Sequence, residues 1–133
     1  MAIDKGIENR VEFLGHVNDV VSIYHLANCF LQPSTANEGV SQSMLQAMAC
    51  ELPVIVSDIG GLNEVVINGV NGLLVNREDS ESISHALKTY ITSPVTCLDY
   101  GKRAREIVKK KYSIETMREK MESIYSLVDT SHA

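Results

Sequence analysis

The chain has 133 residues, which is enough for one ordinary domain and too few for two. Hydrophobic residues make up 44% and charged residues 22%, as in folded soluble domains, and no apolar run approaches the ~18 residues that cross a bilayer. The net charge of −5 gives no electrostatic reason to expect nucleic-acid binding.

Short β-rich runs alternate with helical patterns along the chain. Runs rich in β-branched and aromatic residues predict strands at residues 11–14, 30–32, 53–57 and 73–75. Apolar residues at intervals of three and four predict helices at residues 19–29, 41–50, 79–91, 97–110 and 113–128, with a short helical turn at 63–67. This alternation indicates an α/β fold in which flanking helices cover a parallel sheet of about four strands.

The loops that follow the strands are the expected functional edge, because ligands of such sheets bind beyond the carboxyl ends of the strands. These loops span residues 15–18, 33–40, 58–61 and 76–78. The most polar of them, at residues 34–39, leads directly into a helix. A helix start offers unpaired N–H groups and the positive end of the helix dipole, which together suit a diphosphate.

Three residues of this loop and helix are candidates for contact with such a ligand. Gly39 lets the backbone approach closely, and Glu38 is an acceptor for sugar hydroxyls. Gln46 lies eight residues after Glu38, roughly 12 Å away along a helix, which a diphosphate with a sugar and a ribose at its ends can span. Structural interpretations stay open: Glu38 as a solvated first-turn acid, Ser41 or Ser43 as a helix cap, and Gln46 as an exposed helix residue.

The cysteines and histidines indicate neither disulfides nor a metal centre. Cys29, Cys50 and Cys97 have no paired spacing, and the four histidines are scattered. Disulfide frameworks and zinc sites both need more regular arrangements. We therefore expect reduced, structural cysteines, a cytoplasmic location and no metal site.

Several motifs follow one another in a recognisable order. They are Val11-Glu12-Phe13-Leu14-Gly15-His16-Val17, Pro33-Ser34, Glu38-Gly39, Gln46-Ala47-Met48-Ala49, Leu52-Pro53-Val54-Ile55, Gly60-Gly61-Leu62-Asn63-Glu64 and Asn71-Gly72-Leu73-Leu74-Val75. In this order they resemble the retaining GT-B glycosyltransferases of the large family that includes sucrose synthases and bacterial mannosyl- and glucosyltransferases. The resemblance covers nearly all of residues 8–128. It implies that residues 1–133 are part of the Rossmann-like C-terminal, donor-binding domain, without that domain's first strands and without the N-terminal acceptor domain.

The resemblance implies a role for each residue of the polar loop. Glu38 corresponds to the glutamate that hydrogen-bonds the donor sugar, and it is the candidate catalytic residue. After Gly39, backbone N–H groups hold the distal phosphate and the sugar, which implicates Val40, Ser41 and Gln42. Val17 corresponds to a position that touches the nucleobase.

Four positions depart from the family pattern. Gln46 replaces a glutamate that accepts hydrogen bonds from the ribose; its amide keeps an acceptor oxygen but no charge, so we expect weakened ribose binding. Ser41 stands where many members have glycine. Glu51 replaces a glycine at a helix C-terminus, where the left-handed conformation is favoured, and we interpret it as structural. Asn63 replaces a frequent proline, whereas Glu64 is retained and has a structural alternative as a cap of its own loop.

The implied reaction moves a sugar from a nucleotide-diphosphate sugar to the hydroxyl of a glycan or lipid-linked acceptor, with retention and with no metal or other cofactor. The family's arginine and lysine that neutralise the diphosphate lie upstream of this chain. Arg77, Lys88 and Lys109-Lys110-Lys111 do not match them, and the last run is expected to be a solvated helix end. Peripheral membrane contact is a further expectation for the full enzyme.

The absent strands raise a folding question. Residues 11–14 must pair directly with residues 30–32, detach, or pair with another copy. The last predicted helix also carries an apolar stripe, formed by Ile114, Met117, Met121, Ile124 and Val128. We expect this stripe and the open sheet edge to drive self-association of the isolated chain.

Two functional interpretations stay open. The first is part of a transferase that is inactive on its own. The second is a non-catalytic nucleotide-sugar-binding or assembly module. A dinucleotide-dependent oxidoreductase is disfavoured, because no Gly-x-Gly-x-x-Gly follows a strand.

Overall fold

The computed structural model describes residues 3–130, with side chains through residue 127. Its centre is a parallel sheet of β1 (Phe30–Gln32), β2 (Val54–Ser57) and β3 (Leu73–Val75), in the order β1-β2-β3. Gln32 is in register with Val56, and Val56 with Leu74. The predicted α/β class with a parallel, helix-covered sheet is therefore confirmed, with three strands in the described residues.

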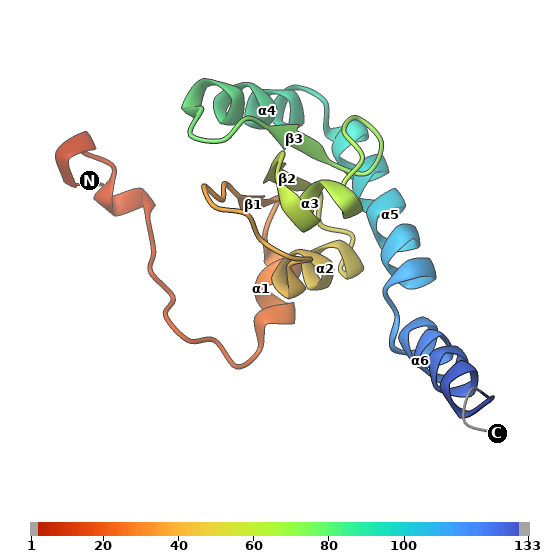
Figure 1. Cartoon of the computed structure of the whole chain (residues 1–133). Helices are drawn as coiled ribbons and strands as arrows, with labels where there is room; N and C mark the ends of the chain where they lie inside the picture. The colour runs from red at the N-terminus through yellow and green to blue at the C-terminus, as the bar shows by residue number, and fades with distance from the viewer. Residues whose placement is uncertain (1–2, 131–133) are drawn as a thin grey trace.

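Helices flank this sheet as the alternating pattern predicts, and the last helix extends away from it (Figure 1). Two short 3₁₀ turns, Ile3–Lys5 and Glu8–Arg10, precede them. The helices are α1 (Val20–Leu26), α2 (Gln42–Ala49), α3 (Gly60–Val65), α4 (Ser80–Thr92), α5 (Pro94–Lys111) and α6 (Ile114–Thr130). Pro94 at the first position of α5 is favourable, because its missing N–H would have no helical partner there.

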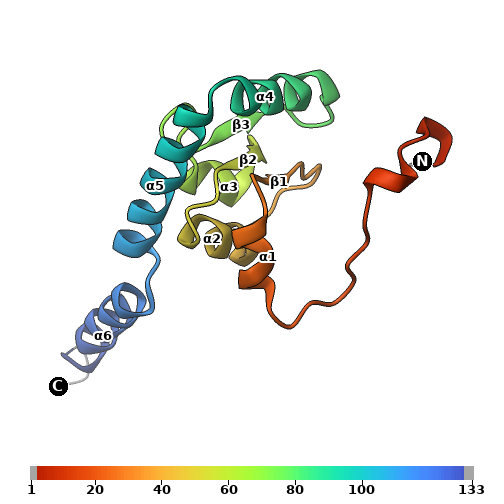
Figure 2. The ribbon, with the colours of Figure 1, turned by 180° about the vertical axis from the view of Figure 1, so that it is seen from behind.

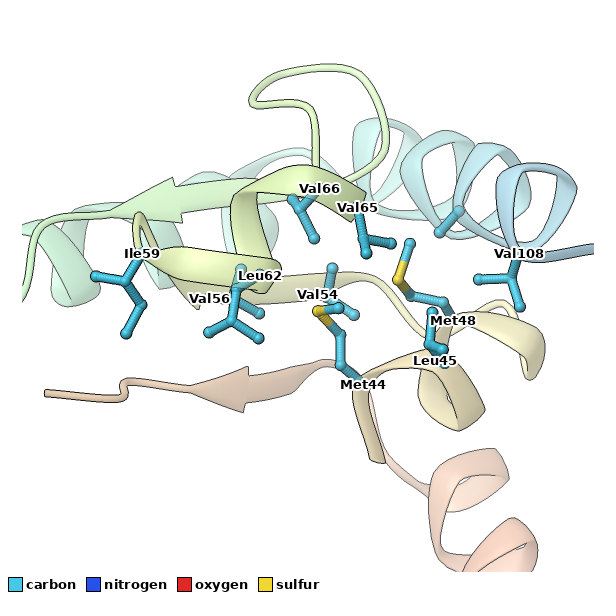
Figure 3. Close-up of a cluster of buried hydrophobic side chains, with 11 residues drawn as sticks. Met44, Leu45, Met48, Val54, Val56, Ile59, Leu62, Val65, Val66 and Val108 are labelled. Atoms are coloured by element: carbon cyan, nitrogen blue, oxygen red, sulfur yellow. The ribbon is translucent and has the colours of Figure 1, made fainter. Parts of the chain in front are cut away.

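The two faces of β2 pack into different parts of the core, because successive side chains of a strand point to opposite faces. Val54 and Val56 join the side chains of α2, α3 and α5 in one cluster (Figure 3). Ile55 faces the other way and packs with Ala86 and Tyr90 of α4. The strand is buried along its whole length, so the sheet is covered on both faces at its centre.

Helix α5 docks tightly against the C-terminal end of α2. A Cβ on Gly101 would lie 2.9 Å from the carbonyl carbon of Glu51 and closer still to its oxygen. Glu51 itself has a φ of 61°, which confirms the predicted left-handed position after α2. The guanidinium of Arg105 donates to the carbonyl oxygen of Ala49 at 2.9 Å, so α5 also satisfies one of the carbonyls that α2 leaves unpaired at its end.

The predicted strand at residues 11–14 is wrong: this segment has no regular structure. It runs away from the body of the molecule before α1 begins (Figures 1 and 2). A strand needs a neighbour for its N–H and C=O groups, and none pairs with this one among residues 3–130. Its side chains gain little from folding back, since Phe13 stays 89% exposed. Of the three expected outcomes, the structure shows the detached one.

The predicted apolar stripe of helix α6 is exposed to solvent. Ile114 is 75% exposed and Met117 is 60% exposed, and Met121 and Ile124 are exposed as well. The side chain of Val128, the fifth member of the predicted stripe, lies outside the described residues. No helix in residues 3–130 is both long enough and apolar enough to span a membrane.

Candidate functional site

The polar loop after β1 holds the carboxylate of Glu38 from two sides. The hydroxyl of Ser34 donates to one oxygen at 2.6 Å, and the side-chain amide of Gln32 donates to the other at 2.5 Å. Glu38 is otherwise exposed. An ionised carboxylate offers about four acceptor positions, so each oxygen of Glu38 keeps room for a further hydrogen bond from a ligand.

The backbone of this loop is pinned to the start of α3. The N–H of Gly61 donates to the carbonyl oxygen of Glu38 at 2.8 Å. A Cβ on Gly61 would lie 2.5 Å from the backbone nitrogen of Val40, and one on Gly60 would meet the backbone of Glu38. Only glycines allow the two backbones to approach this closely, so the Gly-Gly motif supports the loop by direct backbone packing. The helix begins at Gly60, three residues earlier than the predicted turn.

The start of α2 presents unpaired backbone donors beside Glu38. Ser41 caps the helix by accepting from the N–H of Met44 at 3.3 Å, which confirms the structural interpretation of Ser41. Among the described residues, the N–H groups of Val40, Ser41 and Gln42 have no protein acceptor. These donors and the helix dipole together make a favourable place for an anion.

Two further predicted site residues are less constrained. Gln46 is an exposed residue of α2, as its structural interpretation expects, and its side chain makes no hydrogen bond within the described chain. Val17 is half-buried and lies in the segment before α1. Neither hydrogen bonds nor the hydrophobic clusters of residues 3–127 connect Val17 to the loop at 33–41.

Arg77 reaches the same loop from the end of β3, which is separated from β1 by β2. It follows β3, and its guanidinium donates to the carbonyl oxygen of Thr35 at 3.4 Å. The family motifs give Arg77 no role, because it does not match the family's upstream cations. The parallel sheet nevertheless brings the ends of β1 and β3 to one edge, so a positive charge lies beside the loop. Two features were available in the sequence: the strand ending at Val75 and the arginine two residues later.

A cavity of about 630 Å³ lies at the opposite edge of the sheet, and its lining is mostly apolar. Its lining includes all three cysteines, which are unpaired. Burial raises the pKa of the Cys29 and Cys97 thiols, so both stay protonated near neutral pH. Among the described residues no group of three or more His, Cys, Asp or Glu side chains is arranged to hold a metal ion.

Comparison with known proteins points to one family. The model of the family described as glycosyl transferases group 1 matches residues 1–107. The lipopolysaccharide core biosynthesis mannosyltransferase LpcC of Rhizobium leguminosarum bv. viciae is 30% identical over 121 residues, covering 91% of this chain and 34% of that protein. The chain thus spans about a third of the length of this relative.

Solved structures agree with this match. Anabaena HepE in complex with UDP-glucose superposes with a TM-score of 0.90 at 27% identity, over 94% of this chain and 34% of that one. Sucrose-phosphate synthase from Thermosynechococcus elongatus superposes with a TM-score of 0.90 at 29% identity, over 98% of this chain and 33% of that one. The resemblance to the C-terminal part of a GT-B glycosyltransferase is therefore confirmed.

Proposed function

This chain belongs to the glycosyl transferases group 1 family, and we propose that it is the donor-binding part of an enzyme that transfers a sugar from a nucleotide-diphosphate sugar to an acceptor hydroxyl with retention. One observation carries the proposal: a doubly held carboxylate, Glu38, lies next to unpaired N–H groups at the start of α2. A carboxylate that can accept hydrogen bonds from sugar hydroxyls therefore lies beside a site that can bind an anion. A sugar diphosphate requires this combination.

In this proposal each part of the loop has one task. Glu38 accepts hydrogen bonds from hydroxyls of the donor sugar. Gly39 leaves space for the ligand, since a Cβ there would meet nothing within 4 Å. The N–H groups of Val40, Ser41 and Gln42 bind the distal phosphate and stabilise the charge that develops on it as the sugar leaves, which is electrostatic preorganisation.

The nucleoside end of the donor is the weaker part of the proposed site. Gln46 accepts from the ribose through its amide oxygen, without the charge that strengthens such a bond. Val17 contacts the base, which requires the segment before α1 to lie close to the loop when donor is bound. HepE has been solved with UDP-glucose, and we propose the same class of donor here, with base and sugar left open.

The acceptor is proposed to bind outside this chain, which spans about a third of its relative's length. We propose that residues 1–133 are a partial C-terminal domain, that they are inactive alone, and that the acceptor is a glycan or lipid-linked glycan. Peripheral membrane contact of the full enzyme and a cytoplasmic location belong to the same proposal; the unpaired cysteines support the location.

Ligand binding by the 133-residue chain tests the proposed donor class. We expect saturation-transfer signals from at least one of UDP, GDP and ADP, and shifts of the amide resonances of residues 40–43 when it is added. We expect no such response to nicotinamide adenine dinucleotide, because the Gly-rich turn of dinucleotide sites is absent from the sequence. Selective binding of the dinucleotide would overturn the proposed function.

A non-catalytic nucleotide-sugar-binding or assembly module is the second candidate. Gln46 favours it, since the residue that replaces the family's second glutamate carries no charge. The two candidates differ in turnover. If a longer protein containing this sequence releases nucleoside diphosphate from a sugar donor only when acceptor is present, the transferase is supported. Binding without any turnover supports the module.

We also propose that the isolated chain self-associates through α6. Its stripe at Ile114, Met117, Met121 and Ile124 stays exposed, and α6 packs mainly against α5. Association would remove this apolar surface from water. Light scattering should show a mass that rises with protein concentration, and M117E should reduce the rise. A constant monomer mass at high concentration would contradict this proposal.

A further inference from the structure

Gln32 is a polar residue at a place in the sheet where an apolar one is expected. It ends β1 and is in register with Val56 of β2. Side chains two apart on a strand share a face, so Gln32 lies on the same face as Phe30. That face packs against the cluster that α2 and α3 cover, and Phe30 and Val56 both belong to it. Nothing in the packing of this face calls for an amide.

The amide of Gln32 is satisfied on one side only. Its nitrogen donates to Glu38 at 2.5 Å, whereas its oxygen is buried and has no hydrogen-bond partner in the described chain. Turning the amide over would place its oxygen against the carboxylate and leave the nitrogen unpaired. Leaving a buried acceptor unpaired opposes folding. The bond to Glu38 is therefore retained at a cost to stability.

Gln32 and Ser34 together fix the direction of the Glu38 carboxylate. The amide holds one oxygen and the Ser34 hydroxyl holds the other, at 2.5 and 2.6 Å. One donor on each oxygen prevents the carboxylate from rotating freely. The remaining acceptor positions then point in fixed directions, which favours a ligand whose hydroxyls match them and lowers the entropy lost on binding.

We propose that Gln32 is a positioning residue that orients Glu38 toward the hydroxyls of the donor sugar. The inference rests on the proposed role of Glu38 in sugar binding and adds a residue that the loop motif does not contain. Replacing Gln32 with an apolar residue of similar length removes a buried unpaired acceptor while it frees the carboxylate, so stability and sugar recognition change independently or in opposite directions.

Gln32→Met tests this, because methionine is unbranched and of similar length. Affinities are measured by calorimetry for matched pairs of probes, namely UDP with UDP-glucose, GDP with GDP-mannose and ADP with ADP-glucose. In the pair that the wild type binds best, we expect the preference for the sugar conjugate over the free nucleotide to fall about tenfold, as for loss of one charge-assisted hydrogen bond. Free-nucleotide affinity should stay unchanged and the melting temperature should stay equal or rise.

Two controls make the result specific. Gln32→Met should cause no further loss in a Glu38→Ala background, since the residue acts through that carboxylate. Lys88→Met changes an exposed residue of α4, introduces the same side chain away from the loop, and should leave the preference unchanged. An unaltered preference in Gln32→Met overturns this inference alone. A wild type that binds none of the nucleotides overturns the proposed function and this inference with it.

Discussion

Glu38→Ala is expected to reduce sugar transfer by the intact enzyme proposed above by about 10²–10³-fold, the usual effect of removing one preorganised polar group from a reacting centre. Glu38 is placed for this effect because its carboxylate is exposed, oriented by Ser34 and Gln32, and adjacent to the donors at the start of α2. The loss should appear mainly in kcat, since the bonds to the sugar matter most as the sugar leaves the diphosphate.

The same substitution has a second expected signature in the 133-residue chain. Affinity for the free nucleoside diphosphate should change little, whereas the added affinity from the sugar should disappear. Glu38→Gln keeps one acceptor oxygen, which can accept from Gln32, while its NH₂ group can donate to the Ser34 hydroxyl; it therefore separates loss of charge from collapse of the loop. Glu106→Ala removes an exposed carboxylate on α5 and serves as the control. Full transfer activity in Glu38→Ala would sink the assignment of the site.

The parts of the fold that the sequence predicts well have strong local signals. The run at residues 53–57 became β2, and the apolar periodicity of residues 79–91 became α4, which begins one residue after its cap Asp79. Glu51 was placed in the left-handed position because helices commonly end there, and its φ is 61°. These features depend on neighbours in the sequence, so the pattern alone is sufficient.

Features that depend on distant parts of the chain were missed. Residues 11–14 have strand-like composition, but a parallel strand forms only where another strand offers its edge. The helix α3 begins at Gly60 because Gly60 and Gly61 pack against the loop at Glu38. Two consecutive glycines are typical of a loop, so the sequence does not predict a helix start there. The sequence pattern identifies Gln32 only as the end of a strand. Its polar side chain on the same strand face as Phe30 was the feature of the sequence that could have indicated a further role.

The candidate site shows the same division. The motif places Glu38, Gly39 and the start of α2 in one stretch of sequence, so their proximity was predictable. The supports of that stretch come from elsewhere: Gly61 lies more than twenty residues later, and Arg77 follows the next strand but one. Only the parallel order of the sheet brings the ends of β1, β2 and β3 to one edge.

Gly61→Ala is expected to weaken donor binding at least tenfold and to lower the free energy of unfolding by about 1–3 kcal/mol, the usual cost of overpacking. The added Cβ would lie 2.5 Å from the nitrogen of Val40 and 2.9 Å from the oxygen of Gly39. These are backbone atoms, so the clash is relieved only by moving the loop away from α3. That movement displaces the N–H of Val40, a proposed phosphate donor, and strains the bond from Gly61 to Glu38.

Two matched glycine substitutions separate the loop from general instability. Gly101→Ala creates the same kind of clash with the backbone of Glu51, at the contact of α5 with α2, and should lower stability while the folded fraction binds donor normally. Gly39→Ala meets nothing within 4 Å, so stability should hold while the new methyl group obstructs the ligand. Calorimetric affinities, measured below the melting temperature of every variant, distinguish the three. If Gly61→Ala behaved like Gly101→Ala, the start of α3 would support the fold without shaping the donor site.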